Sequence, residues 1–114
     1  MQNADFVLPE APPEHAVIAR FHLGGGDLGV SDQWSLVFAA ERSARAAVSS
    51  SGVGEVDGNE FGGGEVAIFA YGPDAKALYR VMEPHLRALP FRPAHVVLRY
   101  GEPAEDVASE HIDL

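Results

Sequence analysis

The residues of this chain best suited to chemistry are two pairs of arginine and histidine. Arg20 and His22 alternate on one predicted strand, and His95 and Arg99 lie on another. Neutral histidine is a good metal ligand, and arginine pairs with carboxylate or phosphate groups. If the two strands are antiparallel neighbours, His22 falls near His95 and both arginines project from the same side. The sequence thus offers a candidate anion or metal site, against the alternative of a polar sheet surface that pairs with a partner's acids.

A second candidate is the carboxylate pair Asp57 and Glu60, close to a predicted glycine turn. Two carboxylates support acid–base chemistry, or hold a hard cation when a third oxygen ligand converges on them. No third ligand is evident, and residues three apart on an extended strand face opposite sides of the sheet. Hydrogen bonds within a turn are the preferred explanation of Asp57 and Asn59. We predict no catalytic residue, no defined metal site and no cofactor, and place Asp57 and Glu60 at the rim of the arginine and histidine site.

Nucleotide and RNA sites are not indicated. GGGDLG, beginning at Gly24, lacks the lysine and the serine or threonine of a phosphate loop, and the glycines at 62–64 lead into a strand instead of a helix. Phe69 and Tyr71 invite comparison with the stacking aromatics of RNA-binding sheets, but their strand EVAIFAYG contains an acid and no base. The formal charge of −9, from 17 acids and 8 bases, repels phosphate backbones and anionic lipids. We predict neither a nucleic-acid nor a membrane partner.

The size and composition of the chain are those of one soluble domain. The 114 residues suffice for a single core, and no apolar run approaches the roughly 18 to 20 residues that span a bilayer. MQNADFVLPEAPPEH is not a secretory signal, and the chain has no cysteine, so we expect a cytoplasmic protein. Acids and prolines gather at the two ends. We therefore predict an extended tail at residues 1–14, one domain at 15–101 and an acidic tail at 102–114.

Apolar periodicity predicts six elements in the order strand, helix, strand, strand, helix, strand. The first helix should bury the stripe Leu36, Val37, Ala40, Ala44, Ala47 and Val48, with Glu41 and Arg45 on the wet side. Trp34 and Phe38 either widen this stripe or mark a contact surface. The second helix should bury Ala75, Leu78, Tyr79, Met82, Leu86 and Leu89, and Pro84 should kink it or split off its last turn. The predicted elements cover residues 17–23, 31–50, 53–61, 65–71, 75–89 and 94–100.

This order predicts an α+β fold of the ferredoxin-like type, βαββαβ. Right-handed crossovers place both helices on one face of a four-stranded antiparallel sheet. The strand at 65–71 is apolar or aromatic on both faces, which is typical of an interior strand. Its turn is predicted at Gly62–Gly64 in preference to Asp57–Gly58.

The stretch GVGEVDGNEFGGGEVAIFAYGPDAKALYRVMEPHLR, followed by PAHVVLRYG, resembles a group of small uncharacterised conserved bacterial proteins with this fold. The resemblance covers residues 52–101 and depends mainly on DGNEFGGGE and YGPDA. It implies the fold, and no functional residue can be transferred from it.

The sheet face opposite the helices should be apolar at Ile18, Phe69, Tyr71 and Val97. Such a patch usually marks an association surface. Our leading hypothesis is a non-catalytic interaction domain that forms a homodimer through this face, and its acidity would also suit a basic protein partner. The alternative is a protein, conceivably a small enzyme, that binds an anion or a metal on the same face.

Overall fold

The structure, a computed structural model, describes residues 13–24 and 31–114. The predicted α+β class is confirmed. The tail predicted at residues 1–14 lies almost entirely outside the described residues, as does most of the glycine loop that begins at Gly24. The described elements are β1 (His15–His22), α1 (Ser31–Ser51), β2 (Glu55–Gly62), β3 (Glu65–Gly72), α2 (Ala75–Arg87), β4 (Ala94–Arg99) and β5 (Ser109–Asp113).

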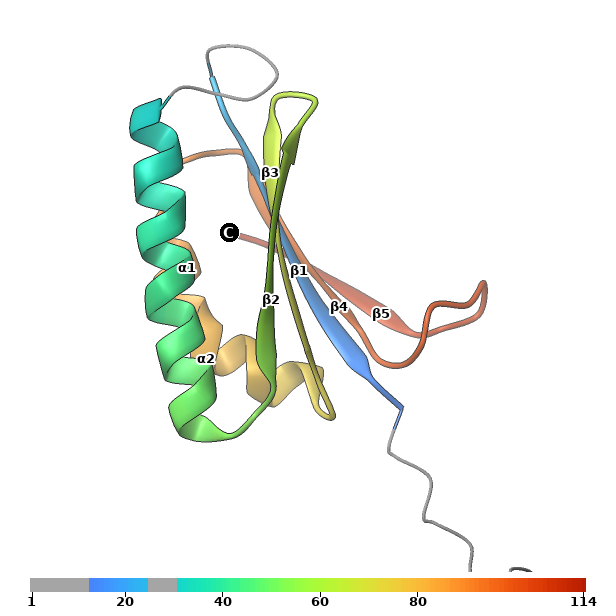
Figure 1. The fold of residues 1–114 in the computed structure, drawn as a ribbon. Coiled ribbons are helices and arrows are strands. Elements are labelled where there is room, and N and C mark those ends of the chain that lie inside the picture. The colour runs from blue at the N-terminus through green and yellow to red at the C-terminus, as the bar shows by residue number, and fades with distance from the viewer. Residues whose placement is uncertain (1–12, 25–30) are drawn as a thin grey trace, which may run out of the picture.

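All neighbouring strands of the sheet are antiparallel, in the order β2-β3-β1-β4-β5. Both helices cover the same face, as predicted, and neither α1 nor α2 lies on the other face (Figure 1). β3 has a strand on each side, which confirms its predicted interior position. The arrangement resembles the predicted ferredoxin-like fold, but it has five strands where we expected four, and the strand order differs accordingly.

The additional strand, β5, lies within the segment 102–114 that the sequence analysis treated as an acidic tail. It pairs with β4 from Arg99↔Ser109 to His95↔Asp113. The Tyr100 hydroxyl donates to Glu110 at 2.7 Å. Partial burial and this hydrogen bond raise the pKa of Tyr100 to about 12, so the phenol remains a donor at neutral pH. The strand SEHID has a single apolar residue, Ile112, so hydrophobic alternation could not reveal it.

The β2–β3 hairpin turns at Gly63 and Gly64, whose φ angles are 60° and 77°. This confirms the preferred turn, because a two-residue hairpin of this kind needs positive φ at both positions, which glycine adopts without strain. The competing site, Asp57–Gly58, is instead a β-bulge, where the pairing register shifts between Val56 and Gly58.

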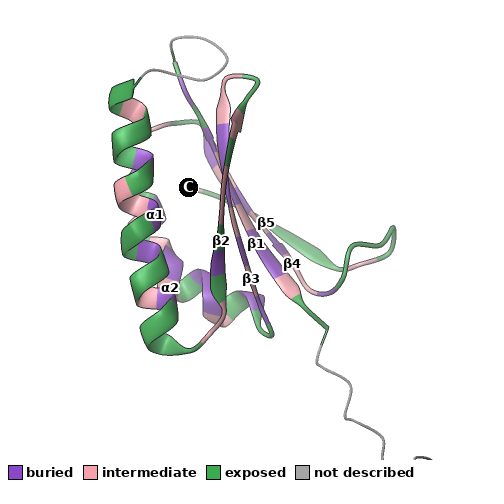
Figure 2. Cartoon of the chain, in the orientation of Figure 1, coloured by how far each residue is buried: buried purple, intermediate pink, exposed green. Residues whose placement is uncertain are grey.

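The core lies between the helices and the sheet (Figure 2). The predicted stripe of α2 is confirmed, and α2 remains continuous through Pro84, so its last turn is not split off. Two side chains satisfy the N-terminal amides of α2: Asp74 accepts from Lys76 N at 3.0 Å, and His15 Nδ1 accepts from Ala75 N at 3.0 Å.

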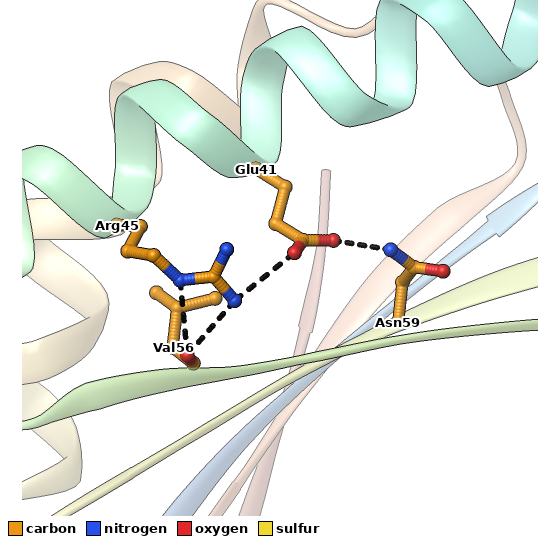
Figure 3. A network of polar contacts seen from close by, with 4 residues as sticks. All are labelled: Glu41, Arg45, Val56 and Asn59. Atoms are coloured by element: carbon orange, nitrogen blue, oxygen red, sulfur yellow. Dashed lines mark hydrogen bonds and ion pairs between the residues drawn. The ribbon is translucent and has the colours of Figure 1, made fainter.

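The predicted stripe of α1 is partly wrong. Leu36 is 48% exposed, and Glu41, expected on the wet side, is only 8% exposed. α1 packs against α2 and also against β2, at the edge of the sheet. A second side of α1, which contains Glu41, is therefore buried against β2. Glu41 there binds Arg45 Nη2 at 3.1 Å and accepts a hydrogen bond from Asn59, while Arg45 donates to the Val56 carbonyl (Figure 3). None of the described helices is long and apolar enough to cross a bilayer.

Candidate interaction surface

The open face, defined here as the sheet surface opposite the helices, has an apolar row across its centre. Phe69 on β3 pairs with Ile18 on β1, and Ile18 pairs in turn with Val97 on β4. All three are half-buried within the chain. Because paired residues of neighbouring strands project to the same side, these side chains form one continuous strip.

Polar and charged residues lie on both sides of this strip. Arg20 is paired with His95 and Arg99 with Ala16, so both arginines project from the open face. The expected closeness of His22 to His95 takes a different form, because His22 is opposite Glu65 on β3 and one pleat beyond the Arg20–His95 pair. Arg20 is therefore the residue directly opposite His95, and His22 is a diagonal neighbour of His95 on the same face.

His95 has a neighbour that the sequence did not reveal. Its ring stacks on His111 of β5, with centroids 4.6 Å apart and an interplanar angle of 15°. His111 Nε2 lies 3.0 Å from Asp113 Oδ1. The sequence gives no sign of this contact, because it depends on the pairing of β5 with β4. Within residues 13–24 and 31–114, no group of three or more histidine, aspartate or glutamate side chains is arranged to hold a metal ion.

The β-bulge of β2 brings Asp57 and Glu60 together. A regular strand would place residues three apart on opposite faces, but the extra residue at the bulge changes the alternation. Both carboxylate residues therefore line one shallow hollow on the open face, of about 400 Å³, whose other side is formed by Phe69 and Tyr71. The hollow combines aromatic surface with negative charge, which suits a cation more than an anion.

Within the described part of the chain, the open face has one ion pair, between His111 and Asp113. None of its arginines is ion-paired within the described part of the chain, and neither are the acids of β2 and β3. Arg99 donates from Nε to the Gly101 carbonyl at 2.8 Å, which holds its guanidinium at the end of β4. The acids that share this face are Glu55, Asp57, Glu60 and Glu65 on β2 and β3, together with Asp113 on β5.

Two further apolar features lie away from the open face. Trp34 and Phe38, which did not fit the stripe of α1, make edge contacts with Phe61 of β2 at centroid distances of 6.0 and 5.9 Å. They thus widen the contact of α1 with the sheet edge, while remaining 36% and 41% exposed. A groove of about 240 Å³ between α1 and α2 is lined by Leu36, His85, Leu89 and small residues.

Comparison with known proteins gives no relative for this chain: nothing among the family models, the curated proteins or the solved structures matches its sequence significantly. The resemblance of residues 52–101 to small bacterial proteins therefore stays a prediction.

Proposed function

We propose that this chain is a non-catalytic interaction domain that self-associates through its open face. The observation that carries the proposal is the strip Phe69, Ile18 and Val97, which is aligned on three adjacent strands and covered by neither α1 nor α2 (Figure 1). A sheet normally buries an apolar face against a second layer. Here the described elements supply that layer on one side only, so a second copy is the simplest cover for the other.

The proposal extends to the finer description of the fold and to location. Leaving β5 aside, the chain follows the βαββαβ order, which is the basis for describing it as ferredoxin-like with an added edge strand. A cytoplasmic location and a basic protein as a second kind of partner fit the absence of cysteine and the net charge of −9.

Phe69→Glu should dissociate the dimer. The substitution replaces an apolar ring in the middle of the strip with a carboxylate, which association would desolvate against the apolar Ile18 and Val97, at a penalty of roughly 3 kcal/mol or about 100-fold in the dimer dissociation constant. Light scattering coupled to size-exclusion chromatography, over a range of concentrations, should show a dimer for the wild type and a monomer for the variant. Far-UV circular dichroism checks that the variant folds.

Leu36→Glu is the matched control for this experiment. It makes the same apolar-to-acid change at a residue that is 48% exposed in the groove between the helices. It should leave the dimer intact. A wild-type chain that stays monomeric at high concentration, or a dimer that Leu36→Glu dissociates while Phe69→Glu does not, contradicts the proposal.

A second candidate function is anion binding. It is favoured by the pairing of Arg20 with His95, since neither side chain forms an ion pair within the described residues, although Asp113 lies opposite His95 on β5. Phosphate or citrate should then raise the melting temperature of the wild type, and Arg20→Ala should remove the shift. Metal ions belong in the same panel, with His22→Ala/His95→Ala as the corresponding variant. A panel without any shift would eliminate this candidate and leave self-association untouched.

A further inference from the structure

The charges of the open face are divided between its two halves. The half formed by β2 and β3 presents only acids among its ionised groups: Glu55, Asp57, Glu60 and Glu65. The half formed by β4 and β5 presents Arg99 and His95, together with His111, which engages the acid Asp113 at 3.0 Å. Arg20 lies between the halves, on the central strand β1. The charge of the open face therefore changes across its strands, from acidic at β2 and β3 to basic at β4.

This division decides how two copies can stack. Two sheets that pack face to face keep their strands within about 30° of each other and lie about 10 Å apart. A two-fold axis that runs across the strands places the acidic half of one copy on the acidic half of the other, which is unfavourable. An axis that runs along the strands exchanges the halves, so each acidic half meets the half that carries Arg99 and His95.

We infer that the dimer forms about a two-fold axis parallel to β1, with Arg99 of each copy entering the hollow of Asp57, Glu60, Phe69 and Tyr71 on the other. This arrangement rests on the proposed self-association and specifies its geometry. β1 is the middle strand of five, so the axis passes near Ile18 and Arg20, and each of these residues meets its own counterpart. Phe69 then lies over Val97 of the second copy, and the apolar strip remains continuous.

The hollow has the chemistry that a guanidinium requires. Arginine stacks on aromatic rings, and its donors pair with carboxylates. Tyr71 occupies the same cross-strand row as Arg99, with Ala16 between them, so exchange of the halves brings the two side chains opposite each other. Asp57 and Glu60 line the same hollow as Tyr71 and have no ion-pair partner within the described chain.

Charge reversal tests the orientation separately from dimerisation itself. The acid-swapped variant Asp57→Lys/Glu60→Lys should weaken the dimer by roughly ten-fold or more at low salt, because lysines now face Arg99. The fully swapped variant, which adds His95→Glu and Arg99→Glu, should dimerise again, since both halves have reversed together. Mixed with the wild type, it should form no heterodimer. Native mass spectrometry resolves the species by their masses.

The outcomes distinguish the two proposals. With the axis across the strands, the fully swapped chain would pair preferentially with the wild type, and that result overturns the inferred orientation while leaving self-association intact. A wild type that is monomeric under all conditions contradicts both the inferred orientation and the proposed self-association. The control variant Asp32→Lys/Glu83→Lys changes the net charge by the same amount as the acid-swapped variant, but its substitutions lie on the two helices, away from the open face. It should leave the dimer unchanged.

A cross-linking experiment answers the same question if the fully swapped chain does not fold. The chain has no cysteine, so single cysteines can be introduced without interference. A short bismaleimide should join Phe69→Cys to Val97→Cys in a mixture of the two variants, because sheets about 10 Å apart bring these positions together. Efficient joining of Phe69→Cys to itself would instead place β3 over β3 and overturn the inferred axis.

Discussion

Gly72→Ala should lower the free energy of unfolding by about 3 kcal/mol or more, a large part of the roughly 5 to 15 kcal/mol typical of a domain. A methyl group at Gly72 would overlap the Val53 carbonyl oxygen and would lie 3.1 Å from the Cα of Gly54. These are backbone atoms at the point where the chain entering β2 crosses the end of β3. Neither can move without disturbing the hairpin, so the overlap is relieved only by separating two paired segments.

Urea unfolding followed by circular dichroism measures this effect. Gly62→Ala, at the other end of the same hairpin, is the matched control, because its added methyl group meets nothing within 4 Å. It should change the free energy of unfolding by less than about 1 kcal/mol. Similar losses for the two variants would show that the close approach of Gly72 to Val53 does not constrain the fold.

Arg45→Met should destabilise the protein by about 2 to 3 kcal/mol. Glu41 is 8% exposed, and Arg45 is the cation that faces its carboxylate, at 3.1 Å. Removing the guanidinium leaves a nearly buried charge supported by the Asn59 amide alone, and also deprives the Val56 carbonyl of its donor (Figure 3). The penalty comes from the unpaired carboxylate more than from the lost attraction.

The chain contains its own control for this prediction. Arg87 and Glu83 on α2 form an ion pair with the same four-residue spacing, but their side chains are 44% and 37% exposed. Arg87→Met should therefore lower stability by less than about 1 kcal/mol. Adding Glu41→Gln to Arg45→Met should recover at least about 1 kcal/mol, because the amide can still accept from Asn59 and carries no charge. Equal effects of Arg45→Met and Arg87→Met would mean that Glu41 is effectively solvated.

Local pattern determined most of the secondary structure. β3 was recognisable because Val66, Ile68 and Ala70 alternate with apolar or aromatic residues, and this requires only the sequence of the strand itself. The glycines of the hairpin turn and the apolar spacing of α2 are equally short-range signals. The order of these elements was enough to predict an α+β fold with both helices on one face.

Contacts between distant segments determined the rest. β5 is a strand because β4 offers it a row of backbone partners, and its own sequence carries almost no apolar signal. Glu41 is buried because β2 crosses that side of α1, and a helical pattern cannot specify which strand will lie above it. Asp57 and Glu60 share a hollow because a bulge, which depends on the pairing of two strands, changes their alternation.

The sequence by itself therefore determined the described helices and strands other than β5, and which residues could make the face opposite the helices apolar. Only the tertiary structure decided which charges share that face, and how they divide between its halves. The physical reason is the distance along the chain over which each interaction acts. Periodicity and turn preference act over a few neighbouring residues, whereas strand order, register and the bulge depend on hydrogen bonds between residues far apart in the chain.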